Sequence, residues 1–479
     1  MKPLWQLGAT QLVAGYGEGL FTPADALQAC LARTAEVNPR LNAVTTLDAE
    51  GAAQAASASA ARWRAGQALG PLDGVPVTVK DSLHVRGLPT HCGSRALGGR
   101  VAVVDETPVA RLREGGAVIF AKSNVPEFAM HGYTGNAVFG ATGNPWNPAL
   151  TPGGSSGGAA ALVASGCCPV ALAQDGGGSI RRPASHTNLV GLKPSRHRVP
   201  RSGGMPKLYL DFEVLGPLAR SVDDVSAMLQ VIGRGAVSPP APQPTRILYI
   251  PRFADHPVDP QIAALTEIAA AQFAALGHEV TTAPRFELAE AVNESWSLMP
   301  QVALAWLLEH PRELSSGPFD APLLGPAMQA NAESGRAASA RALFDLFYEV
   351  ERLRSALDRL FEQHDFLLTP AAAALPWPAD QTHPPQIAGR DVGPRGHAVF
   401  TALANAAGLP GIALPCGWAD PEAAGGSGAR DAPAAWGRHA AGRLPVGLQL
   451  LAREGQDDAL LALARQFERA HPWLRFPEL

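Results

Sequence analysis

The sequence has few cysteines and no strong bias of charge. Its five cysteines are scattered, without CxxC pairs or the spacing of a zinc site: Cys30, Cys92, Cys167, Cys168 and Cys416. This usage fits a reducing compartment, and without an HExxH pattern we expect no metal and no other cofactor. No run of five or six like charges occurs, and 39 Lys and Arg nearly balance 43 Asp and Glu. We therefore expect no nucleic-acid partner.

A long apolar run is also missing. The longest apolar stretch, residues 159–173, is interrupted by Ser165, Gly166 and Pro169, and is too short to cross a bilayer. The opening residues, MKPLWQLGATQLV, have neither the basic start nor the long apolar core of a signal peptide. We therefore expect a soluble, cytoplasmic protein with no membrane partner.

Apolar residues are plentiful, at 46%, and are enough for a sizeable core. The β-branched run at residues 75–79 predicts a buried strand that ends at Lys80, and residues 117–121 predict another. A hydroxyl, a proline and an acid at residues 22–25 predict the start of a helix, with an end near residues 38–39. Such alternation of strands and helices predicts an α/β fold with helices on both faces of the sheet.

The chain of 479 residues is long enough for one large domain or for two to three ordinary ones. We expect a single domain over residues 1–479. Residues 238–244 are a proline-rich connector, and residues 421–442, rich in Ala, Gly and Arg, predict an exposed loop insertion. Residues 287–366 are helix-rich and form the region expected to vary with the substrate.

Two glycine-serine clusters, at residues 153–158 and 176–181, have the composition of functional loops. A phosphate-binding role is less favoured, because neither cluster has the GxxxxGK[ST] or GxGxxG spacing. Residues 153–157 formally fit GxSxG, but that nucleophile elbow follows a strand. Residues 144–152, which contain three prolines, exclude a central strand at that point.

Lys80 and these two clusters together resemble the amidase signature family. The spacings agree: 75 residues separate Lys80 from Ser155, and 24 separate Ser155 from Ser179. The resemblance covers most of the chain and implies a mixed, twisted central sheet covered by helices on both faces. Further matching segments lie at residues 74–76, 122–127, 144–146, 191–194, 216–222, 408–410 and 444–449.

The resemblance implies a catalytic triad. Ser179 resembles the nucleophile, whose hydroxyl reacts poorly until a base removes its proton. Ser155 resembles a bridging serine, held by a cis peptide bond after Gly154, that relays this proton to Lys80. A lysine acts as a base near neutral pH only when burial lowers its pKa, which the apolar strand before Lys80 predicts.

The resemblance also implies supporting groups. Backbone N–H groups of Gly176, Gly177, Gly178 and Ser179 would form the oxyanion hole. Other groups would support the loops or contact the substrate, although a purely structural salt bridge is an equal alternative for Asp175 and Arg181. The supporting residues are Ser156, Asp175 and Arg181, and the substrate-binding residues are Ala129, Met130, His131 and Gly154.

The sequence departs from the family pattern at three positions. Gly176 replaces a usual threonine, which keeps the N–H and loses a side chain. Asn188 and His197 replace usual glycines; asparagine tolerates a left-handed backbone, whereas we have no explanation for the histidine. A Ser179–His186 dyad remains a rival to the lysine mechanism, because His186 follows Ser179 closely.

These observations predict an amidohydrolase that cleaves a carboxamide bond of a small-molecule substrate through an acyl-enzyme. Trp296, Met299, Trp306 and Phe319 hint at an apolar or aryl acyl group, with ordinary core packing as an equal alternative. One rival is the amidase subunit of a tRNA-dependent amidotransferase, although residues 124–127 resemble stand-alone amidases more. Another is an inactive binding or scaffold protein. A homodimer is left open.

Overall fold

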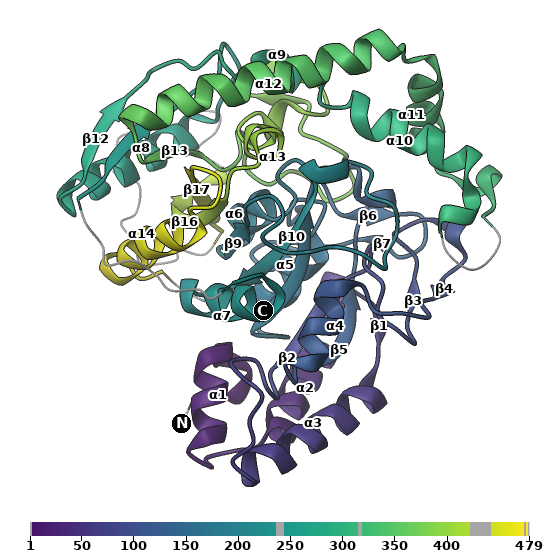
Figure 1. The fold of residues 1–479 in the computed structure, drawn as a ribbon. Coiled ribbons are helices and arrows are strands. Elements are labelled where there is room, and N and C mark those ends of the chain that lie inside the picture. Colours follow the sequence, from purple (N-terminus) through teal and green to yellow (C-terminus); the bar gives the residue numbers. More distant parts are fainter. Residues whose placement is uncertain (1, 236–243, 315–318, 422–441, 474–475, 478) are drawn as a thin grey trace.

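One large sheet organises the chain (Figure 1). The computed structural model describes all residues except 1, 236–243, 315–318, 422–441, 474–475 and 478. The predicted connector and loop insertion therefore fall almost wholly outside the described residues. The sheet has eleven strands, in the spatial order β1 (Val44–Leu47), β5 (Val118–Ser123), β2 (Pro76–Lys80), β8 (Val170–Asp175), β10 (Val214–Ala219), β9 (Val190–Lys193), β16 (Gly411–Ala419), β17 (Leu444–Ala452), β13 (Phe366–Pro370), β11 (Arg246–Tyr249) and β12 (Glu279–Thr282).

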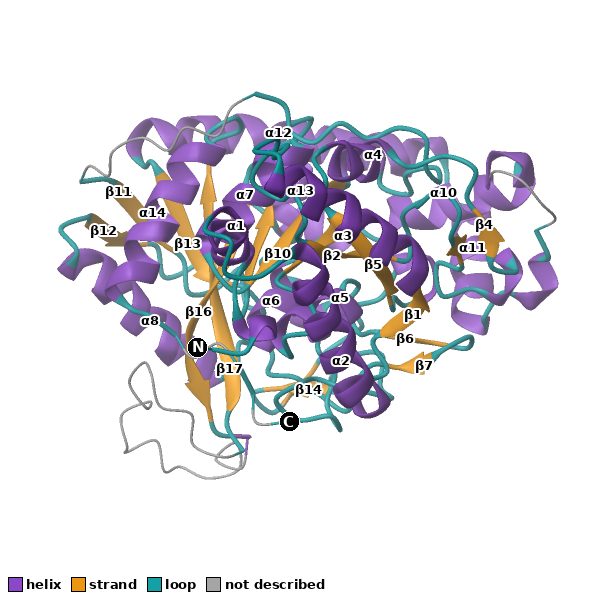
Figure 2. Cartoon of the chain, turned by 90° about the horizontal axis from the view of Figure 1, so that it is seen from below, coloured by secondary structure: helices purple, strands orange, loops and turns teal. Residues whose placement is uncertain are grey.

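The sheet is mixed. Strand β2 runs parallel to both β5 and β8, and β11 runs parallel to β12 and β13. The remaining neighbours, such as β16 and β17, are antiparallel. The mixed, twisted sheet that the family resemblance implies is confirmed, and Figure 2 shows its strands between layers of helices.

Apolar side chains pack on both faces of the sheet. In β8, Val170 and Leu172 join one core, while Ala171 and Ala173 join the other, as the two-residue period of a strand requires. The predicted helices on both faces are thus confirmed. The helices are α1 (Ala9–Gly17), α2 (Pro23–Leu41), α3 (Ala49–Arg64), α4 (Thr107–Glu114), α5 (Gly157–Ala164), α6 (Arg181–Thr187), α7 (Val222–Ile232), α8 (Pro260–Ala275), α9 (Glu290–Ser295), α10 (Leu298–Glu309), α11 (Pro326–Ala337), α12 (Ala340–Gln363), α13 (Ala402–Ala407) and α14 (Asp457–Ala470).

Helix α2 shows what local sequence rules predict well and where they fail. It begins as expected, because Thr22 accepts a hydrogen bond from the N–H of Asp25 and completes a capping box. The predicted end near residues 38–39 is wrong, since the helix continues to Leu41 with Pro39 inside it. A proline in the last turn removes only one hydrogen bond, and Asn42, in a left-handed conformation, ends the helix.

Residues 287–366, the region expected to be helix-rich, contain helices α9 to α12. Helices α10 and α11 pack together at the upper right of Figure 1, and α12 runs along the top of the molecule. Of the large side chains in this region, Trp296 and Met299 are buried in the core. No helix among the described residues combines the length and the apolar character needed to span a membrane.

The central strand β8 carries the loop that contains Ser179, so its packing can be tested separately from chemistry. Replacing the fully buried Leu172 with alanine should lower the free energy of unfolding by about 2–5 kcal/mol, because it leaves a cavity. The control Leu47→Ala, at a position 51% exposed on β1, should change it by less than about 0.5 kcal/mol. Denaturant unfolding measures both; equal losses would contradict this account of the core.

Candidate active site

Lys80 is the last residue of β2 and is fully buried. Its Nζ donates to Ser155 Oγ at 2.7 Å and to the carbonyl oxygen of Gln174 at 3.4 Å. The adjacent carboxylate of Asp81 pairs with Lys122 at 2.9 Å instead. Burial lowers the pKa of Lys80 to about 7. A lysine in this setting is able to exchange a proton near neutral pH.

Ser155 lies in the loop that leads into α5. The Gly154–Ser155 peptide bond is cis, as the family resemblance implies. A side chain at Gly154 would collide with the backbone of Tyr133, so the loop requires glycine there. Ser156 donates to the carbonyl oxygen of Gln174 at 3.1 Å, which is the acceptor that Lys80 also contacts. Ser156 therefore supports the loop by hydrogen bonding, as predicted.

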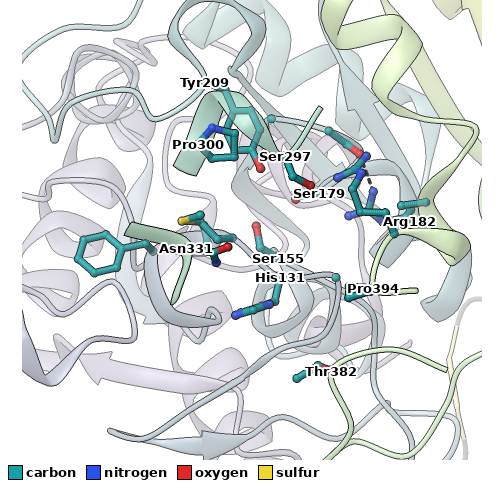
Figure 3. Close-up of a pocket in the computed structure, with 18 of the residues that line it drawn as sticks. His131, Ser155, Ser179, Arg182, Tyr209, Ser297, Pro300, Asn331, Thr382 and Pro394 are labelled. Carbon is teal, nitrogen blue, oxygen red and sulfur yellow. Dashed lines mark hydrogen bonds between the residues drawn. The ribbon is translucent and has the colours of Figure 1, made fainter. Parts of the chain in front are cut away.

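Ser179 lies four residues beyond the end of β8, the parallel neighbour of β2. Parallel strands present their carboxyl ends at one edge of a sheet, which is why Lys80 and the loop that carries Ser179 both lie at that edge. Figure 3 shows Ser155 and Ser179 on the wall of one pocket. No hydrogen bond joins the two hydroxyls among the described contacts, and the loops are tied by Ser156 N–H donating to the carbonyl oxygen of Ser179 at 3.3 Å.

The turn that carries Ser179 is held by the buried carboxylate of Asp175. It accepts hydrogen bonds from the N–H groups of Gly178 at 2.6 Å and Ile180 at 3.1 Å. The expectation that Gly178 offers its N–H to an oxyanion is therefore wrong, because that N–H already has an acceptor. Gly178 has φ of 115°, a conformation that favours glycine.

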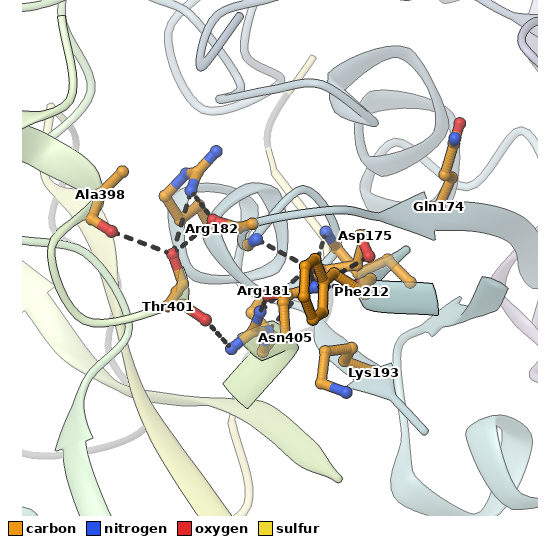
Figure 4. A network of polar contacts seen from close by, with 12 residues as sticks. Gln174, Asp175, Arg181, Arg182, Lys193, Phe212, Ala398, Thr401 and Asn405 are labelled. Atoms are coloured by element: carbon orange, nitrogen blue, oxygen red, sulfur yellow. Dashed lines mark hydrogen bonds and ion pairs between the residues drawn. The ribbon is translucent and has the colours of Figure 1, made fainter. Parts of the chain in front are cut away.

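Arg181 balances this carboxylate. It donates to Asp175 through Nε at 3.0 Å and Nη2 at 2.9 Å, and also to Asn405 Oδ1 (Figure 4). Its Nη1 donates to Gln449 Oε1 at 2.7 Å. Burial alone would raise the pKa of Asp175, but the charge and hydrogen bonds of Arg181 hold it well below its ordinary range. Both residues support the turn, and neither lines the pocket.

Three backbone amides near Ser179 keep their hydrogen-bonding capacity. Within the described part of the chain, the N–H groups of Gly176, Gly177 and Ser179 have no acceptor. Gly176 and Gly177 also line the pocket. At Gly176 an added Cβ would lie 2.8 Å from the ring of Tyr209. The tyrosine ring therefore occupies the space that a side chain at position 176 would need.

Arg182 joins the two glycine-serine loops, and sequence reasoning missed it. Its Nη1 donates to the carbonyl oxygen of Gly177 at 2.5 Å and to Thr401 Oγ1 at 3.0 Å. Its Nη2 donates to the carbonyl oxygen of Gly154 at 3.2 Å. Two consecutive arginines directly after a glycine-serine cluster were the available signal. Thr401, in contrast, lies 219 positions away from Arg182 in sequence, and no sequence signal indicated its contact.

The pocket has a volume of about 390 Å³. Of the predicted substrate-binding residues, Ala129, Met130 and His131 line it, whereas Gly154 does not. Trp296, Met299, Trp306 and Phe319 do not line it either. The lining residues not predicted individually from sequence are Phe128, Gly132, Gln174, Arg182, Tyr209, Glu213, Ser297, Pro300, Gln301, Ala327, Asn331, Thr382, Pro394, Arg395, His397 and Ala398.

His186 does not contact Ser179. Its Nε2 pairs with the carbonyl oxygen of Ala374 at 3.2 Å, and the ring lies against Trp377. Burial lowers the pKa of His186 to about 4. The alternative Ser179–His186 dyad therefore lacks a structural basis. Among the described residues, no group of three or more His, Cys, Asp or Glu side chains is arranged to hold a metal.

The two remaining departures from the family pattern have left-handed backbones. Asn188, with φ of 62°, ends α6, as its tolerance of this conformation predicts. His197 has φ of 63° and is exposed, with Nε2 3.9 Å from Asp211. A histidine accepts this conformation less readily than glycine, and within the described part of the chain the contact with Asp211 is the interaction found at this residue.

Comparison with known proteins assigns the chain to a family. The family model described as Amidase matches residues 25–461. The chain therefore belongs to the amidase family, the amidase signature enzymes that its sequence resembles. A solved bacterial aryl acylamidase of this family has a TM-score of 0.86 and 26% identity, with 98% of each chain covered. A 6-aminohexanoate cyclic dimer hydrolase, solved with substrate, has a TM-score of 0.84 and 29% identity, with 99% of each chain covered.

Curated relatives have higher sequence identity to this chain than these two solved structures, and they are named as amidotransferase subunits. The A subunit of the glutamyl-tRNA(Gln) amidotransferase of Synechococcus sp. (strain CC9605) is 33% identical, covering 92% of this chain and 91% of that subunit. The protein of the same name from Roseiflexus sp. (strain RS-1) is also 33% identical, covering 100% and 99%. The chain is thus similar along nearly its whole length both to an aryl acylamidase and a cyclic dimer hydrolase and to amidotransferase A subunits.

The Asp175–Arg181 pair gives a testable difference between a buried and an exposed charge pair. Asp175→Asn leaves Arg181 buried without a countercharge, so the free energy of unfolding should fall by about 3–5 kcal/mol. The control Asp255→Asn breaks an exposed pair with Arg285 and should cost at most about 1 kcal/mol. Denaturant unfolding at neutral pH compares them; a small effect at Asp175 would show that other groups hold the turn.

Proposed function

We propose that this protein hydrolyses a carboxamide bond through an acyl-enzyme on Ser179, with Ser155 and Lys80 as its proton relay. The observation that carries the proposal is the 2.7 Å contact of a buried lysine with Ser155, beside a pocket that both serines line. Burial lowers the pKa of Lys80 to about 7, which matches a base to neutral pH. The membership of the amidase family supports the same chemistry.

In the first half-reaction, Ser179 Oγ attacks the amide carbonyl carbon. Its proton passes to Ser155 Oγ as the Ser155 proton passes to neutral Lys80 Nζ. The free amides of Gly176, Gly177 and Ser179 stabilise the negative charge that develops on the carbonyl oxygen. The C–N bond then breaks, and the relay returns a proton to the departing nitrogen. The hydroxyls need to approach as substrate binds, since such contacts often shorten only in the complex.

Water completes the reaction. It attacks the acyl-enzyme carbonyl, gives its proton to the relay, and releases the carboxylic acid while Ser179 recovers its proton. The apolar or aryl acyl group predicted from sequence loses its basis, because the large side chains that suggested it lie outside the pocket lining. The single-domain organisation, the homodimer and the cytoplasmic location stay predictions.

A second candidate is the amidase subunit of a tRNA-dependent amidotransferase. The relatives that are named as A subunits of glutamyl-tRNA(Gln) amidotransferase, at 33% identity, favour it. The sequence argument against it rests on residues 124–127, but the Glu127 carboxylate accepts hydrogen bonds from Ser94 and the N–H of Gly325. Because Glu127 of this motif has a structural role, the motif does not distinguish a stand-alone amidase from an amidotransferase subunit. Release of ammonia or an amine from simple amides by the purified chain alone would argue against the subunit role.

Covalent labelling tests the nucleophile directly. A fluorophosphonate should label Ser179, and Ser179→Ala should abolish labelling and lower amide turnover on the order of 10⁴-fold or more. The control Ser297→Ala, which removes another hydroxyl of the pocket wall, should still be labelled. Mass spectrometry locates the adduct. A folded wild-type protein that is not labelled would favour the inactive binding or scaffold protein.

The pH dependence tests the base. Because only neutral Lys80 accepts a proton, kcat/KM for an amide should rise with pH and level off above an apparent pKa of about 7. Lys80→Met should remove both the rise and most of the activity. Initial rates between pH 5 and 9 measure the profile. A rate that is already maximal at pH 5 would rule out Lys80 as the base.

A further inference from the structure

A second feature of the pocket is an arginine without a countercharge. Arg395 lies between β15 (Arg390–Asp391) and the short helix η7 (Gly396–Ala398), and its side chain lines the pocket. Its Nη2 is buried without a hydrogen-bond acceptor, and its guanidinium forms no ion pair or hydrogen bond among the described residues. Burial lowers the pKa of Arg395. Leaving a buried charged donor unsatisfied is costly.

The other charged groups of the pocket do not neutralise it. Arg182 is a second cation, and its three hydrogen bonds all go to neutral oxygens. The acidic lining residue Glu213 shares Arg201 with Glu106, so these three groups carry one net negative charge against the two positive charges of Arg182 and Arg395. Burial keeps the pKa of His131, at about 4, and that of His397 below the ordinary value, so both rings are neutral at pH 7. The wall around Arg395 therefore carries uncompensated positive charge.

The position of Arg395 places this charge near the reaction centre. Helix η7 is followed closely by Thr401, which donates to the carbonyl oxygen of Gly177 at 2.7 Å. Pro394, the residue before Arg395, lies on the same side of the pocket as Arg182 in Figure 3. A group bound by Arg395 would thus belong to the molecule whose carbonyl faces Ser179.

We propose that the substrate is an amide whose acyl part carries a carboxylate, and that Arg395 binds this carboxylate. A planar guanidinium matches a carboxylate in a paired geometry, and such charged hydrogen bonds are strong where water is excluded. The volume of about 390 Å³ suits a small monoamide of a dicarboxylic acid. This inference rests on the proposed function, because it names the substrate class of the same site.

The kinetic test compares amides of equal length with and without the charge. Wild type should hydrolyse succinamate and glutaramate with a lower KM than butyramide and valeramide. Arg395→Gln should raise KM for the charged amides on the order of 10- to 100-fold and leave that of the neutral amides within about threefold. Arg395→Lys should restore part of the loss. The control Arg341→Gln removes an exposed positive charge on α12 and should change KM for neither the charged nor the neutral amides.

The thermal stability of Arg395→Gln separates recognition from a structural role. Arg395 is only partly exposed and its buried Nη2 has no acceptor, so its removal should leave the unfolding temperature unchanged or raise it. If Arg395→Gln raises KM equally for charged and neutral amides and also lowers the unfolding temperature, the proposal is overturned. A wild-type preference for the neutral amides would overturn it as well.

Binding without turnover distinguishes this proposal from the proposed function. In Ser179→Ala, glutarate should raise the unfolding temperature, and Ser179→Ala with Arg395→Gln should lose that shift. If glutarate binds in this way and no amide is hydrolysed, the proposed function fails while the carboxylate site stands. If amides are hydrolysed but glutarate does not bind, the carboxylate site fails alone.

Discussion

The geometry of the site depends on one buried carboxylate. Asp175 is fully buried away from bulk solvent, and its charge is satisfied by hydrogen bonds from Arg181, Asn405 and two amides of its own turn. Those bonds fix the direction in which the turn leaves β8. Asp175 accepts from the amides of Gly178 and Ile180, whereas among the described residues those of Gly176, Gly177 and Ser179 have no acceptor. A structural ion pair thereby determines which donors are free for chemistry.

Lys80 shows the opposite use of burial. No described carboxylate pairs with it, since the nearest in sequence, Asp81, is held by Lys122. Desolvation then outweighs the charge of Asp175, which acts to raise the pKa of Lys80, and lowers that pKa to about 7. Burial therefore leads to opposite charge states at two residues beside the same loops. Asp175 is kept ionised by its partners, and Lys80 is allowed to become neutral because it lacks one.

The sequence predicted what short-range patterns control. The strand before Lys80 and the start of α2 follow from side-chain shape and capping chemistry. The family resemblance supplied Lys80, Ser155 and Ser179, which the fold brings to one edge of the sheet. Tyr209, Thr401, Asn405 and Gln449 were missed, because strand register and distant helices bring them to the loops. Gly178 was misassigned because residue type does not reveal which amide of a turn is already bonded.

The link that Arg182 makes between the two glycine-serine loops has a consequence for how this protein can change. Its guanidinium holds the carbonyl oxygens of Gly154 and Gly177, so the two serines are mounted on one stiff unit. Other residues of the pocket wall come from elsewhere in the fold, including Gln301 on α10, Asn331 on α11 and Arg395 before α13. Mutations there can redirect the enzyme to new compounds while the reacting groups stay in place, which makes the pocket wall its most evolvable part.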